Sequence, residues 1–188
     1  ETQHCSLSEC SFTFGPYLQS FKYLNHATDT LRSHLSWKEN LVSTARSIIN
    51  QIRKDPATVV VGIHVRRSDV LQLDYLHAAP MEYFQRAIYY FLDKFDGNVI
   101  FILASDDISW CKAQKEFDKA FFLNNLDAAL DMAILSCADH HILSVGSFGW
   151  WSAWLSKPGE VTYYKNAIDM NHPANVGRVT LEDYYPDS

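Results

Sequence analysis

Apolar residues follow two alternating patterns along this chain. Some segments repeat their apolar positions every three to four residues, as an amphipathic helix does: 36–53, 80–92, 106–118, 126–138 and a Trp-rich stretch that follows residue 146. Between them lie short, mostly apolar runs: 59–65, 98–104, 120–123, 141–145 and 161–164. Such short runs are typical of buried strands, and strands that alternate with helices predict an α/β fold, a Rossmann-like parallel sheet with helices on both faces.

Local signals mark several of the predicted boundaries. Ser36 with Glu39 forms a capping-box pattern at the start of the first helix, and Pro80 opens the second. Asp106 or Asp107 is expected to cap the third. Residues 1–36 are expected to be irregular, and the tail after residue 166 shows no clear periodicity.

Composition narrows the function classes. With 47% hydrophobic and 20% charged residues, the chain has the profile of a globular protein. Its formal net charge of −6 argues against general nucleic-acid binding, which needs a broad basic surface. No apolar stretch approaches the ~18 residues of a membrane span, and no signal peptide is visible. The chain begins at Glu1 without a Met, which suggests a processed or truncated piece.

The four cysteines do not form a metal-binding pattern. Cys5 and Cys10 are close enough in sequence to close a small loop in an oxidising compartment, whereas Cys111 and Cys137 fall in apolar helical patterns and are expected to be buried. No C-x-x-C pair is present, so a structural zinc site is not expected. The neighbours His140 and His141 would point to opposite faces of a strand, which also argues against a metal site.

Three strand ends carry the candidate chemistry. Arg66 and Arg67 follow the first strand, Ser105 and Asp106 follow the second, and the run Gly146-Ser147-Phe148-Gly149 follows the fourth. In a parallel sheet these ends open on one edge, where ligands bind. Guanidinium groups and the N–H groups of a helix N-terminus both bind phosphate, so the edge is predicted to be a nucleotide site without a P-loop, with Asp106 on the N–H edge of a purine.

Each piece also has a purely structural interpretation. The Arg pair is also compatible with surface salt bridges, although the apolar run before it and the Asp after it favour a ligand. An Asp before a helix is often only an N-cap, Gly-Ser-Phe-Gly can be a simple turn, and Ser147 can cap the next helix. The cluster of Trp150, Trp151 and Trp154 is typical of core packing as well as of a sugar platform. The order of the three segments, each directly after a strand, favours the functional interpretation.

The same segments resemble those of the alpha-1,2-fucosyltransferases, glycosyltransferase family 11. The matching motifs are His64-Val65-Arg66-Arg67-Ser68-Asp69, Ser105 to Cys111, Asp131-Met132-Ala133-Ile134-Leu135, and Gly146-Ser147-Phe148-Gly149-Trp150, with Gly15 to Tyr23 upstream of them. The likeness covers residues 15–165. Ser68 stands where the family usually has Gly, and Asp139-His140-His141 replaces its usual Asn-His-Thr.

This resemblance implies a fold and an architecture. Residues 56–188 would form the GDP-sugar-binding lobe of a GT-B glycosyltransferase, and residues 1–55 a remnant of the acceptor-side lobe with its connecting helix. The full-length form would be a type II membrane protein of the Golgi lumen, held in the membrane by a segment absent from this chain.

The resemblance also implies an activity. L-fucose would pass from GDP-fucose to a galactoside hydroxyl of a glycan in alpha-1,2 linkage, with inversion and without a metal or cofactor. Arg66 would bind the β-phosphate, with Gly146, Ser147 and Phe148 completing the cradle. His64 would contact donor or acceptor, and Arg67 would share the phosphate or brace the loop.

Several questions stay open at this stage. Asp69 is a candidate for the catalytic base but equally for orienting Arg66, and the base could also come from a missing lobe. Two other functions fit the same residues: a non-catalytic nucleotide-sugar or glycan-binding module, and a fucosyltransferase of another linkage, alpha-1,6 or protein O-fucosyl.

Overall fold

The computed structural model describes residues 21–124 and 127–176, and its centre is a parallel β-sheet. The strands of this described part are β1 (Val59–Val65), β2 (Val99–Ser105), β3 (Ala120–Phe122), β4 (His140–Leu143) and β5 (Val161–Tyr163). Their order in the sheet is β3-β2-β1-β4-β5, and each neighbouring pair is parallel. This order confirms the predicted α/β fold and places β1 at the centre.

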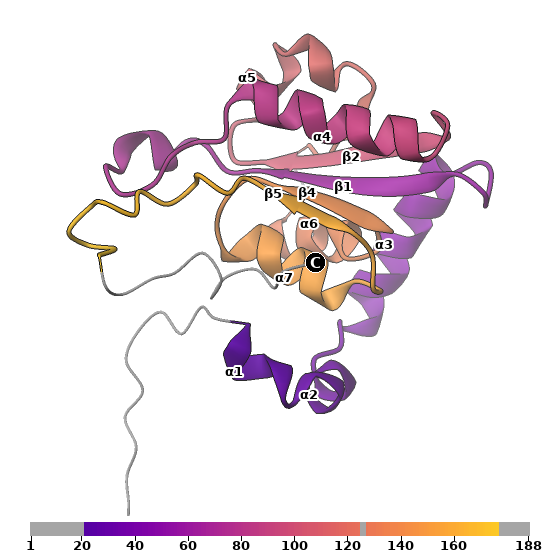
Figure 1. Cartoon of the computed structure of the whole chain (residues 1–188). Helices are drawn as coiled ribbons and strands as arrows, with labels where there is room; N and C mark the ends of the chain where they lie inside the picture. The colour runs from indigo at the N-terminus through magenta and orange to yellow at the C-terminus, as the bar shows by residue number, and fades with distance from the viewer. Residues whose placement is uncertain (1–20, 125–126, 177–188) are drawn as a thin grey trace, which may run out of the picture.

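Helices cover both faces of the sheet. Those of the described residues are α1 (Lys22–Asn25), α2 (Thr28–His34), α3 (Glu39–Ile52), α4 (Met81–Lys94), α5 (Ile108–Lys112), α6 (Ala128–Leu135) and α7 (Ser147–Leu155), with short 3-10 turns η1 (Val70–Gln72) and η2 (Lys115–Phe117). Figure 1 shows α4 and α5 on one face and α3, α6 and α7 on the other. The helices α1 and α2 lie beyond α7 on that second face.

The alternation of side chains along β1 builds a core on each face. Val61, Ile63 and Val65 belong to the core under α4, together with Phe84 and Phe91. On the other face Val60 shares a core with residues of α3 and α6. Because successive strand residues point to opposite faces, a mostly apolar run such as this one is what a strand buried on both sides requires.

Several predicted boundaries differ from the structure. The helix predicted over residues 36–53 is α3, which begins only at Glu39. Lys38 precedes it without a side-chain cap, so the predicted capping box is wrong. Trp37 explains the shift, because its Nε1 donates a hydrogen bond to Ser136 Oγ (2.8 Å) and draws this segment onto the end of α6. The helix predicted over residues 106–118 is α5, which ends already at Lys112. Gln114, two residues later, has extended backbone and precedes η2.

The segment before residue 36 is also more regular than expected. Residues 22–25 and 28–34 form α1 and α2, so the expectation of an irregular segment is wrong there. Cys5, Cys10 and the motif from Gly15 to Ser20 lie outside the described residues. Cys111 is fully buried, as expected, while Cys137 is only partly buried.

Helix α3 joins the sheet in one core. Its buried residues Ala45 and Ile49 pack in the same cluster as Val60 of β1 and Ile134 of α6. The assignment of residues 1–55 to a remnant of a second lobe stays a prediction. In the part of the chain that the structure describes, no helix has the length and apolarity needed to cross a membrane.

The core under α4 gives a direct test of the packing. Phe84 is fully buried with its ring 5.4 Å from that of Phe117, so Phe84→Ala is expected to lower the free energy of unfolding by about 3–5 kcal/mol, measured by urea denaturation. Phe121→Ala is the matched control, because Phe121 is 48% exposed and its truncation is expected to cost under about 0.5 kcal/mol. Equal costs for the two variants would contradict this assignment of the core.

Candidate functional site

The ends of β1, β2 and β4 meet at one edge of the sheet. Val65 is in register with Ser105 of β2, and His64 with Leu143 of β4. Beyond the strands the backbone N–H of Arg66 donates to Ser144 Oγ (2.8 Å), which ties the end of β1 to the end of β4. The three predicted segments are therefore brought together.

Arg66 is held in a planar pair with Asp69. Its Nε donates to Oδ1 (3.0 Å) and its Nη2 to Oδ2 (2.6 Å), so one guanidinium edge grips both carboxylate oxygens. The hydrogen bonds raise the pKa of Arg66 and lower the pKa of Asp69. The Arg66 side chain is 34% exposed, which leaves part of the guanidinium open at the edge of the sheet.

The other side of Arg66 lies against the start of α7. Gly146 precedes this helix with φ of +98°, a conformation that side chains strongly disfavour. A Cβ at Gly146 would also lie 2.7 Å from Arg66 Nη1. Two independent reasons therefore require glycine at residue 146. The absence of a side chain lets the guanidinium of Arg66 approach the N-terminus of α7, where unpaired N–H groups favour anions.

His64 lies beneath the same helix. Its ring stacks on Phe148, with centroids 5.1 Å apart, and a Cβ on Gly149 would lie only 2.7 Å from His64 Nδ1. Burial, and secondarily the charge of Arg66, lowers the pKa of His64 to about 4, so the ring is neutral at physiological pH. Nδ1 is buried and has no hydrogen-bond partner among the described residues.

Arg67 contacts residues that follow β2. Its Nη1 donates to Asp107 Oδ2 (3.1 Å), and its guanidinium stands over the ring of Trp110 at 4.5 Å. Asp107 also caps α5, because its Oδ1 accepts the N–H of Trp110. These contacts link the end of β1 to the end of β2; whether Arg67 also shares the phosphate stays a prediction.

Asp106 and Ser105 are both engaged by backbone groups. Asp106 accepts the N–H of Arg67 (2.8 Å) and of Ser68 (3.0 Å), one on each carboxylate oxygen. Ser105 Oγ accepts the N–H of Asp107 (2.9 Å). These contacts fix the loop that carries Arg66 and Arg67 to the end of β2.

Asp131 belongs to one of the motifs that carry the family resemblance, but no role was predicted for it. It lies near the N-terminal end of α6, which connects β3 to the parallel strand β4 and therefore runs back from the carboxyl edge of the sheet. Its Oδ1 is buried without a hydrogen-bond partner among the described residues. Burial, with a contribution from the charge of Asp127, raises the pKa of Asp131 to about 6. An unpaired buried carboxylate is costly, so it points to a missing donor.

The tryptophan cluster is neither fully buried nor fully exposed. Trp150, Trp151 and Trp154 contact one another, and Arg32 of α2 stands 4.8 Å over the ring of Trp154. A cavity of about 710 Å³ lies between α2, α7 and the edge strand β5, lined in part by Trp150 and Trp154. In the described residues no group of three His, Cys, Asp or Glu side chains is arranged to hold a metal ion.

Comparison with known sequences decides the family. A sequence profile described as glycosyl transferase family 11 matches residues 1–175. The chain belongs to glycosyl transferase family 11. This confirms the resemblance seen in the motifs.

Curated relatives match over most of this chain. It is 30% identical over 161 residues to galactoside alpha-(1,2)-fucosyltransferase 1 of Bos taurus, and 28% identical over 160 residues to the Homo sapiens protein of that name. An alpha-1,2-colitosyltransferase of Escherichia coli is 30% identical over 154 residues. The matches cover 77–78% of this chain but only 43–51% of those relatives, so the chain spans about half of their length.

Solved structures share the fold. A crystal structure of POFUT1 in complex with GDP superposes with a TM-score of 0.58 at 14% identity, covering 73% of this chain and 49% of that one. A second POFUT1–GDP structure gives a TM-score of 0.54 at 14% identity, covering 81% of this chain and 62% of that one. At this identity the likeness supports the fold alone.

The contact between Gly149 and His64 yields a prediction with a definite sign. In an exposed helix interior Gly→Ala stabilises by up to about 1 kcal/mol. Here Gly149→Ala is expected to destabilise by about 1–3 kcal/mol, because the new methyl group meets a buried ring that cannot move. In a His64→Ala background the same change should become neutral or stabilising, as urea denaturation of the four proteins would show. A stabilising Gly149→Ala in the parent protein would contradict this packing.

Proposed function

We propose that this chain forms the donor-binding lobe of an alpha-1,2-fucosyltransferase, which transfers L-fucose from GDP-fucose to a galactoside hydroxyl with inversion. The observation that carries the proposal is the position of Arg66, paired with Asp69 and pressed against the N-terminus of α7 at the carboxyl edge of the sheet. Membership of family 11 and the printed names of the relatives support the reaction. POFUT1 structures that share the fold hold GDP, which supports the donor.

The chemical difficulty of this reaction is the departure of GDP. Negative charge gathers on the β-phosphate as the bond to the sugar breaks. The Arg66 guanidinium and the N–H groups at the start of α7, at Ser147 and Phe148, would stabilise that charge by hydrogen bonds and electrostatic attraction. Loss of one such preorganised donor typically costs about 3 kcal/mol of transition-state stabilisation.

Asp69 serves Arg66 in this proposal. Both of its oxygens accept hydrogen bonds from the guanidinium, and its lowered pKa makes it a poor proton acceptor. These contacts favour orientation of Arg66 over base catalysis, the two roles that the sequence left equal.

Asp131 is the carboxylate that we assign to the guanine base. A guanine presents two adjacent N–H donors on one edge, and Asp131 offers a buried oxygen that lacks a donor. Asp106, the earlier candidate, has both oxygens engaged by backbone N–H groups. His64, neutral and stacked on Phe148, would form part of the wall between the base and the phosphates.

The proposal includes no metal ion or cofactor, because Arg66 and the helix N-terminus supply the positive charge that phosphate needs. Addition of EDTA is therefore expected to leave the rate of fucose transfer unchanged in a radiolabel transfer assay. Restoration of a lost rate by Mg²⁺ or Mn²⁺ after EDTA treatment would contradict this part of the proposal.

A binding module is the second candidate function. The chain spans about half of its curated relatives, and a donor lobe on its own would bind GDP-fucose without transfer. Incubation with GDP-fucose and a galactoside separates the two functions, because only an enzyme forms a fucosylated product. The acceptor glycan, a Golgi location and a membrane anchor outside this chain all remain part of the proposal.

Arg66 gives the sharpest test of donor binding. GDP at 100 times its Kd stabilises a folded protein by about 2.7 kcal/mol, which appears as a higher melting temperature. Arg66→Ala is expected to abolish this protection, and Arg66→Lys to reduce it, since Lys lacks the planar fork that pairs with Asp69 and phosphate together. Arg86→Ala, at an exposed position of α4, is the matched control and should keep full protection. Full protection of Arg66→Ala by GDP would remove the phosphate role.

A further inference from the structure

The proposed transfer needs a base for the acceptor hydroxyl, and none of the residues assigned to the donor site so far suits that role. Both carboxylate oxygens of Asp69 accept hydrogen bonds from Arg66, and both carboxylate oxygens of Asp106 accept hydrogen bonds from backbone N–H groups. His64 is buried beneath α7. A base must stand at the same edge of the sheet with an oxygen or nitrogen open to an incoming hydroxyl.

Two segments far apart in sequence come together at the carboxyl edge of the sheet, where Val70 and Ala167 pack against Val145. The loop after η1 pairs with the segment after β5 through an antiparallel bridge between Leu76 and Ile168. His77 N–H donates to Ala167 O (2.8 Å), and Asn175 Nδ2 donates to Tyr75 O (3.0 Å). Ala167 and Asn175 are buried, so this loop pair is anchored rather than loosely attached.

The pair presents Asp74 next to His172. His172 Nε2 lies 3.4 Å from Asp74 Oδ2, and His172 Nδ1 accepts the backbone N–H of Ala174 (3.1 Å). Because Nδ1 is an acceptor, the ring proton of neutral His172 resides on Nε2 and points at Asp74. The histidine side chain is 24% exposed and the aspartate 83%, so the ring is fixed while the carboxylate faces solvent.

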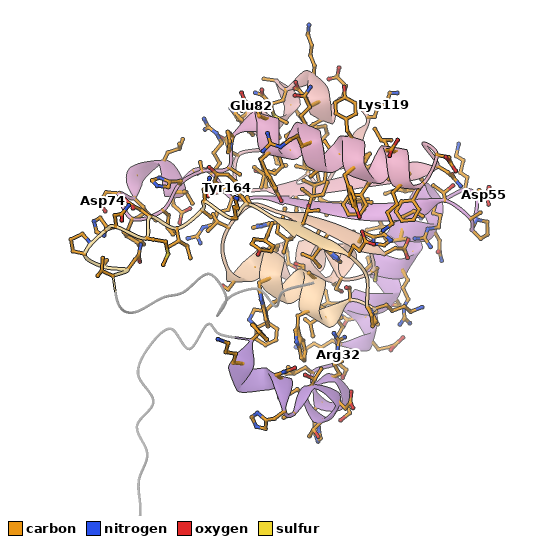
Figure 2. The ribbon with its side chains drawn as sticks, in the orientation of Figure 1. Arg32, Asp55, Asp74, Glu82, Lys119 and Tyr164 are labelled. Atoms are coloured by element: carbon orange, nitrogen blue, oxygen red, sulfur yellow. The ribbon has the colours of Figure 1, made fainter. Side chains whose placement is uncertain are left out.

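A small core ties this loop pair to the sheet. Val70 and Ala167 pack with Val145, which directly precedes Gly146, and Leu76 packs against the same cluster, while the ring of Tyr75 lies 5.9 Å from that of His172. The loop pair that carries Asp74 and His172 thus packs at the carboxyl edge of the sheet, the edge that also carries Arg66. In Figure 2 Asp74 stands at the opposite end of the molecule from Asp55, which precedes the amino end of β1.

We propose that Asp74 is the general base of the transfer and that His172 is a positioning residue that orients its carboxylate. Asp74 Oδ2 faces the imidazole N–H, while Oδ1 makes no hydrogen bond with the described residues. The acceptor hydroxyl oxygen attacks the anomeric carbon and gives its proton to Asp74. The bond from that carbon to the β-phosphate oxygen breaks, and GDP leaves with the electron pair. This assignment rests on the proposed function.

The test measures kcat for transfer and the Kd for GDP-fucose in Asp74 variants and in the parent protein. Asp74→Asn keeps the shape and removes the base, so kcat for transfer to a galactoside is expected to fall about 100-fold or more. The Kd for GDP-fucose, measured by calorimetry, should stay within twofold of the parent. Asp74→Glu should recover a substantial part of kcat. Asp118→Asn, an exposed aspartate before β3 at the other edge of the sheet, is the matched control and should change neither quantity.

His172 has its own pair of variants. His172→Gln keeps an N–H near the position of Nε2, whereas His172→Ala removes it. We expect His172→Ala to lower kcat with little change in KM for GDP-fucose, and His172→Gln to restore most of it. A purely structural role would instead lower the melting temperature in proportion to the activity.

The outcomes separate this inference from the function on which it rests. If the parent transfers fucose and Asp74→Asn retains its kcat, the base assignment is wrong while the proposed function stands. A parallel loss of donor affinity and kcat in Asp74→Asn would also overturn it. If the parent binds GDP-fucose without transfer, the binding-module alternative holds and the base assignment falls with it. If the parent does not bind GDP-fucose, the proposed function itself fails.

Discussion

The paired guanidinium of Arg66, held between Asp69 and the glycine that opens α7, is the constraint on which the site depends. Asp69 fixes the plane of the guanidinium, and Gly146 allows it to lie against a helix N-terminus. The approach of Arg66 to Gly146 requires β1 and β4 to end at the same level of the sheet, which their register ensures. The fold thus positions one cation beside the N–H groups of α7.

This arrangement explains how an acidic protein can offer a phosphate site. The net charge of −6 rules out attraction by the surface as a whole, so binding must come from a local concentration of donors. The two glycines of the α7 motif each accommodate one side chain of the β1 motif: Gly146 receives Arg66, and Gly149 receives His64. The two motifs are therefore one structural unit, although about 80 residues separate them in the sequence.

The sequence pattern predicted the parallel sheet and the edge at which the three motifs meet, because β-branched runs and strand-end motifs are local signals. It failed where tertiary contacts decide. Trp37 overrides the predicted capping box at the start of α3. No role was predicted for Asp131 or for the pair of Asp74 with His172, because an unpaired buried oxygen and a contact between residues 98 positions apart exist only after folding. The family resemblance, not periodicity, supplied the donor and the linkage.

A crystal structure of the protein with GDP would test the central claim most directly. Our account predicts that the β-phosphate lies on the guanidinium of Arg66 and the first N–H groups of α7, with the guanine edge on Asp131 and no metal ion between the phosphates. GDP bound elsewhere on the sheet, or phosphates that leave Arg66 untouched, would contradict it.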